Sequence, residues 1–303
     1  MKNYFSLFGK IAVLCLFILL SGVQPLSAQS TQLHVLNFKK AKDLKAFFAY
    51  KEGNSILVTG HRGGYATNYV ENTIESMENV LRYMPAFFEI DPRLTKDSVI
   101  VLMHDGTLDR VSTSKGKVRD YTYEELKSVR LKDHLGNVTN CKIPTLEETI
   151  VWSKGKTIIN LDKKDVPLPM IAALIKKHKA ERHVMLTVHS GAQARYYYDR
   201  FPEIMFSAHI RNQKEFEDIE ISGVPWSNIM AYVGYTIDAK NKAICKKLHD
   251  RGVRCMVGLS PTADLFPTEK ERAVEYKKEI DKRPDVIESN IPTEVWQVIQ
   301  TQK

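Results

Sequence analysis

Short apolar runs rich in β-branched residues recur along this 303-residue chain, and stretches with helical spacing separate most of them. The runs lie at 56–59, 87–90, 99–103, 157–161, 184–188, 205–208, 229–233, 253–257 and 286–287. The helical stretches lie at 72–83, 146–153, 169–178, 192–198, 213–219, 239–250 and 268–280. A repeated strand-then-helix pattern predicts parallel strands joined by helical crossovers. Strands that are apolar throughout fit a sheet covered on both faces.

Nine candidate strands are one more than a (β/α)8 barrel needs, and the short segment 95–98 resolves the difference. This segment, Thr95-Lys96-Asp97-Ser98, has no room for a helix and is typical of a hairpin turn. A turn centred between positions 96 and 97 places residue 104 opposite residue 89. The sequence therefore predicts an α/β fold, a (β/α)8 TIM barrel with a β-hairpin and an insertion after the second strand.

The first residues have the pattern of a secretory signal peptide. Lys2 and Lys10 precede an apolar run at 11–20, and Ala28 offers a small residue for cleavage. The run is too short to span a bilayer comfortably, and nothing later resembles a membrane span. We expect 1–28 to be removed and 29–303 to form a single secreted domain, periplasmic if the host is Gram-negative.

Two further segments of the mature chain have predicted places on the barrel. Residues 39–50 form a short helix that caps its bottom, and the polar stretch 105–143 is an insertion on its rim.

Net charge and cysteine content narrow the possible partners and cofactors. The net charge of +8 suits nucleic acid, anionic membranes or phosphorylated small molecules. Because the basic residues are scattered, with no run of five or more, we expect no nucleic-acid partner.

The mature chain keeps Cys141, Cys245 and Cys255, whose spacing matches no zinc pattern. A Cys245–Cys255 bridge is one alternative in an oxidising compartment, and buried free thiols are the favoured one.

Reactive side chains follow or end four of the predicted strands. Barrel enzymes place their catalytic groups at this carboxyl end. Alternation along an extended chain puts the acidic pair of the second strand on one face, and likewise the Asp and Lys after the run 157–161. The residues are His61, Arg62, Glu89, Asp91, His104, Asp162 and Lys164. Each alone is more often an ordinary loop residue, but their coincidence at the same strand ends favours a site.

These residue types fit displacement at phosphorus. Three carboxylates without cysteine form a hard oxygen site, suited to one Mg²⁺ or Ca²⁺ rather than zinc. Two histidines can act as general base and general acid near neutral pH. Arg62 and Lys164 can hold the non-bridging oxygens of a phosphate.

Several ordered motifs resemble the glycerophosphodiester phosphodiesterase family. They are HRGG and ENT within 61–73, EIDPRL and VLMHDGTLDR within 89–110, IPTLEE at 143–148 and INLDKK at 159–164. The match is dense over 60–164 and weaker beyond 165. The resemblance implies a TIM barrel of the phosphatidylinositol phospholipase C-like type. It also implies hydrolysis of a small glycerophosphodiester to glycerol 3-phosphate and an alcohol with a divalent cation.

The resemblance implies a role for each site residue. His61 and His104 are the acid/base pair, and Glu89 and Asp91 are metal ligands. Arg62 is a phosphate ligand, and Lys164 supplies charge near the phosphate.

One departure from the family pattern keeps alternatives open. Asp162 stands where the family usually has Glu as third metal ligand, and the related spider-venom phospholipase D group has Asp there. A phospholipase D-like or lyase activity on lysolipids that yields a cyclic phosphate is therefore one alternative. A non-catalytic phosphoester-binding protein is another. The choice between Mg²⁺ and Ca²⁺, the head group and the oligomeric state stay open.

Overall fold

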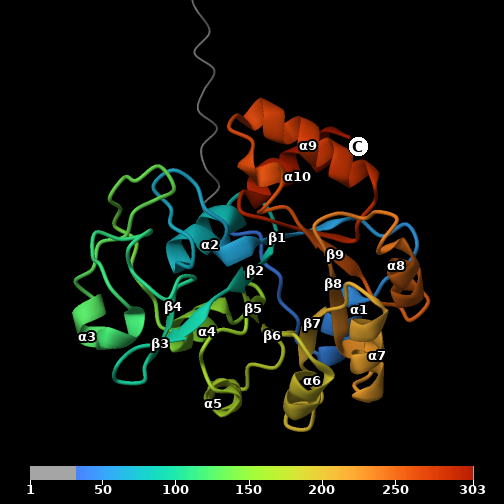
Figure 1. Cartoon of the computed structure of the whole chain (residues 1–303), viewed down its shortest axis with the longest axis horizontal. Coiled ribbons are helices and arrows are strands. Elements are labelled where there is room, and N and C mark those ends of the chain that lie inside the picture. Colours follow the sequence, from blue (N-terminus) through green and yellow to red (C-terminus); the bar gives the residue numbers. More distant parts are fainter. Residues whose placement is uncertain (1–31, 303) are drawn as a thin grey trace, which may run out of the picture.

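The computed structural model describes residues 32–302, in which eight parallel strands close into a barrel (Figure 1). The strand order around the barrel is β1-β10-β9-β8-β7-β6-β5-β2. The strands are β1 Leu57–Gly60, β2 Phe87–Ile90, β5 Ile159–Leu161, β6 Val184–Val188, β7 Met205–His209, β8 Ile229–Gly234, β9 Cys255–Gly258 and β10 Val286–Ser289. The predicted TIM barrel is confirmed. The predicted signal peptide, residues 1–28, lies outside the described residues.

Helices connect the strands and cover the outside of the barrel (Figure 1). They are α2 Ile74–Leu81, α4 Leu146–Ser153, α5 Leu168–His178, α6 Gly191–Tyr198, α7 Gln213–Ile221, α8 Lys242–His249, α9 Glu269–Asp281 and α10 Pro292–Thr301. Capping explains several of their starts: Thr145 and Thr268 each form a capping box with the Glu three residues later. The last helix, α10, begins with Pro292, whose fixed φ suits a first helical position.

The barrel interior changes from apolar to polar within two residues along seven of its eight strands. The lower layer contains Phe87, Ile158, Met185, Met205, Met230, Met256 and Val286, which belong to one buried apolar cluster. The residues two positions further along line a cavity: Glu89, Asn160, Thr187, Ser207, Tyr232, Gly258 and Glu288. Since side chains alternate along a strand, both layers point inward. The polar layer is the floor of the candidate site.

The short helix α1, Ala41–Phe48, closes the bottom of the barrel, as predicted for 39–50. Its buried Leu44 and Phe48 belong to the same apolar cluster as the lower interior layer. The ring of Phe48 meets that of Phe87 edge to face, with centroids 5.3 Å apart. Apolar packing therefore seals the end of the barrel opposite the polar layer.

The predicted hairpin exists, but its predicted register is wrong by one residue. In β3, Pro92–Leu94, and β4, Ile100–Leu102, Pro92 pairs with Leu102 and Leu94 with Ile100, so the turn is centred on Asp97. The turn is a three-residue loop, because Thr95 N–H still donates to the Val99 carbonyl. Ser98 takes a φ of 63°, the left-handed conformation that such loops need. Position 104 consequently falls opposite 90 rather than 89.

The insertion at 105–143 lies at one side of the barrel and carries the short helix α3, Tyr123–Leu126 (Figure 1). It has an apolar cluster of its own, which includes Leu108, Val118, Leu131 and Cys141. All three cysteines of the described residues are buried and unpaired, the favoured of the two alternatives.

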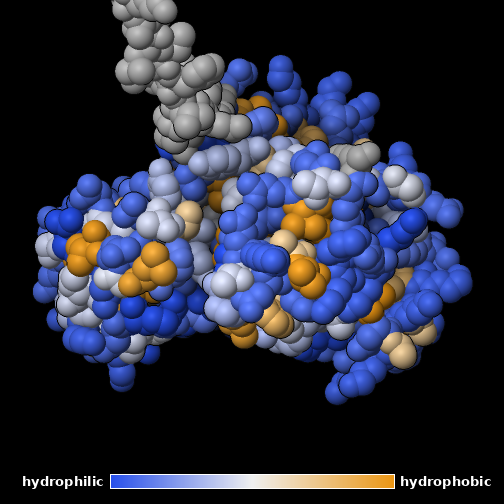
Figure 2. All heavy atoms as spheres, turned by 90° about the horizontal axis from the view of Figure 1, so that it is seen from above, coloured by the Kyte–Doolittle hydropathy of each residue, from blue (hydrophilic) through white to orange (hydrophobic). Residues whose placement is uncertain are grey.

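The face of the molecule in Figure 2 is mostly hydrophilic, with small separate hydrophobic groups. Within residues 32–302 no helix has both the length and the apolar character needed to cross a membrane.

Gly191, the first residue of α6, has no room for a side chain. A Cβ there would lie 2.1 Å from the Asp218 carbonyl oxygen of α7. We expect Gly191→Ala to destabilise the protein by about 1–3 kcal/mol, since the helix backbone must shift. Gly106→Ala is the matched control, because nothing lies within 4 Å of its Cβ position. Urea denaturation measures both, and equal midpoints would contradict the prediction.

Candidate active site

Three carboxylates meet at the carboxyl ends of two neighbouring strands. Glu89 lies in β2 and Asp91 directly follows it, while Asp162 directly follows β5, which pairs with β2. One oxygen from each lies within 4.8 Å of the other two. Glu89 and Asp91 are buried, and Asp162 is partly exposed. The structure thus brings together the three predicted metal ligands.

The charge of this cluster favours a cation between the carboxylates. Burial, together with the neighbouring Asp91 and Asp162, raises the pKa of Glu89 well above its ordinary value. Burial likewise raises the pKa of Glu288, a fourth carboxylate on the same floor. Among the described residues, the Asp91 Oδ1 atom is one of four buried side-chain polar atoms that accept or donate no well-directed hydrogen bond. Apart from an ion pair with the Lys164 ammonium, this buried carboxylate oxygen has lone-pair capacity left, which fits a divalent cation inside an acidic cluster.

Lys164 partly balances these charges. Its Nζ lies 2.9 Å from Asp91 Oδ1 and 2.5 Å from Asp162 Oδ2. Burial alone would lower the pKa of Lys164, but the two carboxylates raise it overall, so the ammonium stays charged. Burial would raise the pKa of Asp162, but His189 and Lys164 lower it. One ammonium cannot neutralise the whole acidic cluster.

His61 follows β1 and presents one defined nitrogen to the cluster. Its Nδ1 lies 2.7 Å from the amide oxygen of Asn290, which only accepts, so Nδ1 donates the hydrogen bond. Its Nε2 lies 3.9 Å from Glu89 Oε2. Asn290 is itself fixed, because its N–H donates to the buried Asp264. The neutral ring therefore carries its lone pair on Nε2, which faces the carboxylate cluster.

His104 follows the hairpin and is held by a carboxylate. Its Nδ1 donates to Asp105 Oδ1 at 2.7 Å, and Arg110 fixes Asp105 from the other side with Nε 2.8 Å from Oδ2. Burial lowers the pKa of His104, and the hydrogen bond to Asp105 offsets this lowering only in part. Both predicted histidines line the same cavity, with their Nδ1 atoms occupied.

Arg62 occupies a left-handed backbone conformation, with a φ of 54° and a ψ of 34°. Its N–H donates to Glu89 Oε2 at 2.8 Å, and its carbonyl accepts from the N–H of Asn72. Left-handed backbone costs a non-glycine residue about 1–2 kcal/mol, and these two bonds hold it in place. The guanidinium contacts Glu71, and its buried Nε makes no hydrogen bond. Arg62 thus lines the cavity with unsatisfied donor capacity.

Two adjoining hollows meet at His61 and Arg62. One, of about 330 Å³, lies over the polar layer of the barrel and also contains His104, His189 and His209. The other, of about 600 Å³, runs beneath the insertion and is lined by residues such as Tyr65, Arg110 and His134. A substrate centred on the carboxylates can therefore extend to either side.

Several residues at the site escape prediction from the sequence. Asn72 forms two hydrogen bonds with Asp91. The Asn72 side-chain amide N–H donates to Asp91 Oδ2 at 2.7 Å, and the Asn72 side-chain oxygen accepts from the Asp91 backbone N–H at 2.9 Å. Thr73 caps α2, since its Oγ1 accepts from the Ser76 N–H. Glu288 and His189 also lie at strand carboxyl ends, so the rule that finds Glu89 would find them.

Known proteins resemble this chain in sequence. A model of the glycerophosphoryl diester phosphodiesterase family matches residues 61–208. A glycerophosphodiester phosphodiesterase from Bacillus altitudinis is 39% identical over 114 residues, which are 36% of this chain and 45% of that protein. Glycerophosphodiester phosphodiesterase 1 from Bos taurus is 29% identical over 157 residues, 48% of this chain and 46% of that protein. The chain thus spans about half the length of these curated relatives.

Solved structures extend the likeness beyond the matched half. The crystal structure of a glycerophosphoryl diester phosphodiesterase from Parabacteroides distasonis is 49% identical, with a TM-score of 0.87 over 89% of this chain and 95% of that chain. A phosphodiesterase from Oleispira antarctica, in complex with the product sn-glycerol-3-phosphate, is 17% identical, with a TM-score of 0.59 over 84% of this chain and 99% of that chain. At that identity the second likeness shows the fold alone.

Proposed function

This chain belongs to the glycerophosphodiester phosphodiesterase family, and we propose that it hydrolyses small glycerophosphodiesters to glycerol 3-phosphate and an alcohol. One observation carries the proposal. Two histidines whose Nδ1 atoms are already hydrogen-bonded line a cavity beside three carboxylates able to share a cation. This combination supplies proton transfer and charge neutralisation together, which displacement at phosphorus requires.

Arg62 and Lys164 bind and orient the phosphate. Both line the cavity over the carboxylates. A guanidinium and an ammonium at fixed positions hold two non-bridging oxygens and align the phosphorus for attack. The glycerol and alcohol arms extend into the two hollows on either side.

The two histidines move the protons. Because burial lowers the pKa of His104, its Nε2 is unprotonated near neutrality and accepts the proton of the attacking water. The water oxygen bonds to phosphorus while the bond to the alcohol oxygen breaks. The imidazolium of His61 donates its Nε2 proton to that oxygen. Proton exchange with solvent restores both rings.

Glu89, Asp91 and Asp162 hold one Mg²⁺ or Ca²⁺, both of which prefer oxygen ligands. When bound, the cation supplies positive charge that offsets the charge developing on the phosphate. Asn72 orients Asp91 through two hydrogen bonds, and the Arg62 N–H orients Glu89. The protein therefore positions its ligands through backbone and amide contacts.

We also propose that the enzyme acts outside the cytoplasm, as a single domain from residue 29. The support is the charged start, apolar run and small residue at Ala28. Phosphodiesters released from lipid breakdown are small, soluble substrates for such an enzyme.

Removing metal should abolish turnover. Purified protein from residue 29 is offered glycerophosphocholine, glycerophosphoethanolamine and glycerophosphoinositol with Mg²⁺, Ca²⁺ or EDTA, and phosphorus NMR identifies the products. We expect glycerol 3-phosphate only when a cation is present. A cyclic phosphate would instead indicate attack by a substrate hydroxyl. Activity that persists in EDTA would contradict the role of the carboxylates, and no product from any substrate would favour a phosphoester-binding protein.

A further inference from the structure

At the end of the barrel opposite the three carboxylates, the structure brings together a histidine, a cysteine and an aspartate. His249 ends α8, Cys255 begins β9 and Asp285 directly precedes β10. One nitrogen, one sulfur and one oxygen of these residues lie within 4.8 Å of one another. We propose that they form a second metal site, for a thiophilic divalent cation such as Zn²⁺.

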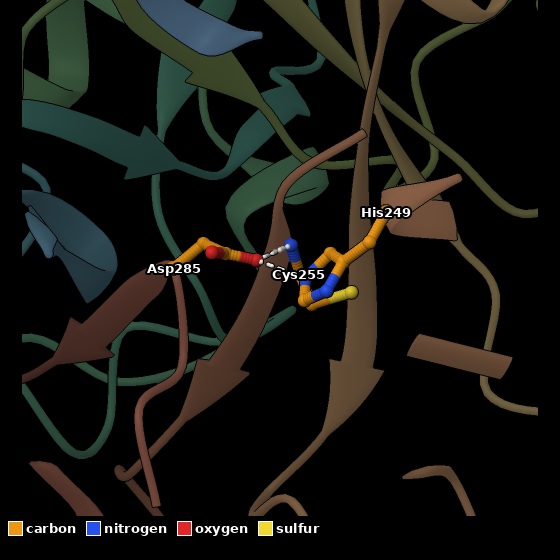
Figure 3. A group of neighbouring side chains, drawn as sticks. All are labelled: His249, Cys255 and Asp285. Carbon is orange, nitrogen blue, oxygen red and sulfur yellow. Dashed lines mark hydrogen bonds and ion pairs between the residues drawn. The ribbon is translucent and has the colours of Figure 1, made fainter. Parts of the chain in front are cut away.

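The orientation of the three side chains supports this proposal (Figure 3). His249 Nε2 lies 2.7 Å from Asp285 Oδ2, and the backbone N–H of Cys255 donates to the same oxygen at 2.7 Å. The His249 ring stacks on Tyr50, with centroids 3.7 Å apart, which fixes the direction of its nitrogens. Metal ligands in proteins are characteristically held in this way by surrounding contacts. A cation would take the place of the proton between His249 and Asp285.

Cys245 can supply a second sulfur. It lies four residues before His249 on α8, so both side chains are on one face of the helix. The Cys255 thiol donates to the Cys245 carbonyl oxygen, with 3.9 Å between Sγ and O, so the two cysteines lie side by side. Two sulfurs, one imidazole and one carboxylate are ligands that Zn²⁺ accepts in tetrahedral sites. A cavity of about 670 Å³ is lined by all four residues and provides an entry path.

The two ends of the barrel would therefore select different cations. The three carboxylates at one end offer only oxygen ligands, which suit Mg²⁺ or Ca²⁺. The nitrogen of His249 and the sulfur of Cys255 at the other end suit Zn²⁺. The bottom ligands come from α8, β9 and the start of β10, so the cation would join three elements. Their spacing in sequence matches no zinc pattern because the barrel, not a short loop, brings them together.

Cobalt spectroscopy tests the proposal independently of catalysis. Reduced, EDTA-treated protein is titrated with Co²⁺, and the near-ultraviolet thiolate charge-transfer band is recorded. An oxygen-only site gives no such band. We expect the band to reach a plateau as Co²⁺ is added and to disappear when Zn²⁺ displaces Co²⁺, and we expect a higher melting temperature with Zn²⁺ bound. Both Cys255→Ser and His249→Gln should weaken Co²⁺ binding by at least about 100-fold.

Cys141→Ser is the matched control, because Cys141 is equally buried but lies in the insertion. It should keep the full band. His249 is partly exposed, so His249→Gln tests the site even if Cys255→Ser fails to fold. No band in the wild type, or an unchanged band in His249→Gln, would overturn the proposal. Cys245→Ser should lose about half of the band, and an unchanged band would remove Cys245 from the ligand set.

Discussion

Replacing His104 by alanine should lower kcat on glycerophosphodiesters by about 10²–10⁴-fold, the usual contribution of a general acid or base. The ring lines the cavity beside the carboxylates, and Asp105 holds its Nδ1, so Nε2 is the atom left for proton transfer. Alanine removes that atom without touching any of the three carboxylates. Calcium affinity, measured by calorimetry, should therefore stay unchanged while initial rates fall.

His178→Ala is the control for this substitution. His178 is also held by a carboxylate, with Nε2 2.7 Å from Glu147 Oε1, but it lies on the outer helix α5. Its replacement should leave kcat unchanged. Comparable loss in both variants, or full activity in His104→Ala, would exclude the proposed role of His104.

The pH dependence gives a second readout at the same residue. Burial lowers the pKa of His104, and the hydrogen bond that its Nδ1 donates to Asp105 opposes this lowering. Asp105→Asn removes the negative charge that favours the protonated ring, so the pKa of His104 should fall further. If His104 is the base, the acidic limb of the kcat/KM profile then moves to lower pH. A limb that moves to higher pH would contradict this assignment.

Strand and helix positions follow from the sequence because burial of apolar residues determines both. The segment 87–90 is a strand and 146–153 a helix with the predicted bounds, since local pattern and tertiary contacts agree there. The hairpin register does not follow, because one residue at 98 in the left-handed region adds a position to the turn. A one-residue difference in such a loop changes every pair along the hairpin.

The predicted site residues follow from one rule, that reactive groups lie at strand carboxyl ends. The rule finds charged residues readily, but it gives no reason to select Asn290 or Asn72. Asn290 matters only because Gly60 pairs with Ser289, which puts the residue after β10 beside His61. Asn72 matters only because Arg62 turns the chain so that Asn72 faces Asp91. Both contacts depend on three-dimensional register, which residue type alone does not reveal.

Glu89→Gln should stabilise the cation-free protein while it removes activity. The pKa of Glu89 is raised above its ordinary value of 4.5 by burial and by neighbouring carboxylates. The stability linked to this group is therefore fully present below the unfolded pKa and is lost as pH rises toward the folded pKa. Glutamine stays uncharged, so in EDTA near neutrality the variant should melt above the wild type. The difference should shrink at acidic pH.

The same substitution should lower calcium affinity and kcat by at least roughly 100-fold, because a cation ligand is lost. Glutamine can still accept the N–H of Arg62, so the left-handed turn is retained. Glu147→Gln is a control of opposite sign: hydrogen bonds from Lys177 and His178 lower the pKa of Glu147, so its loss should not stabilise the protein near neutrality. Lower stability of Glu89→Gln in EDTA with activity retained would make Glu89 an ordinary structural residue. Higher stability of Glu89→Gln with activity lost would show that the acidic cluster lowers the stability of the cation-free protein, and that the bound cation offsets this loss.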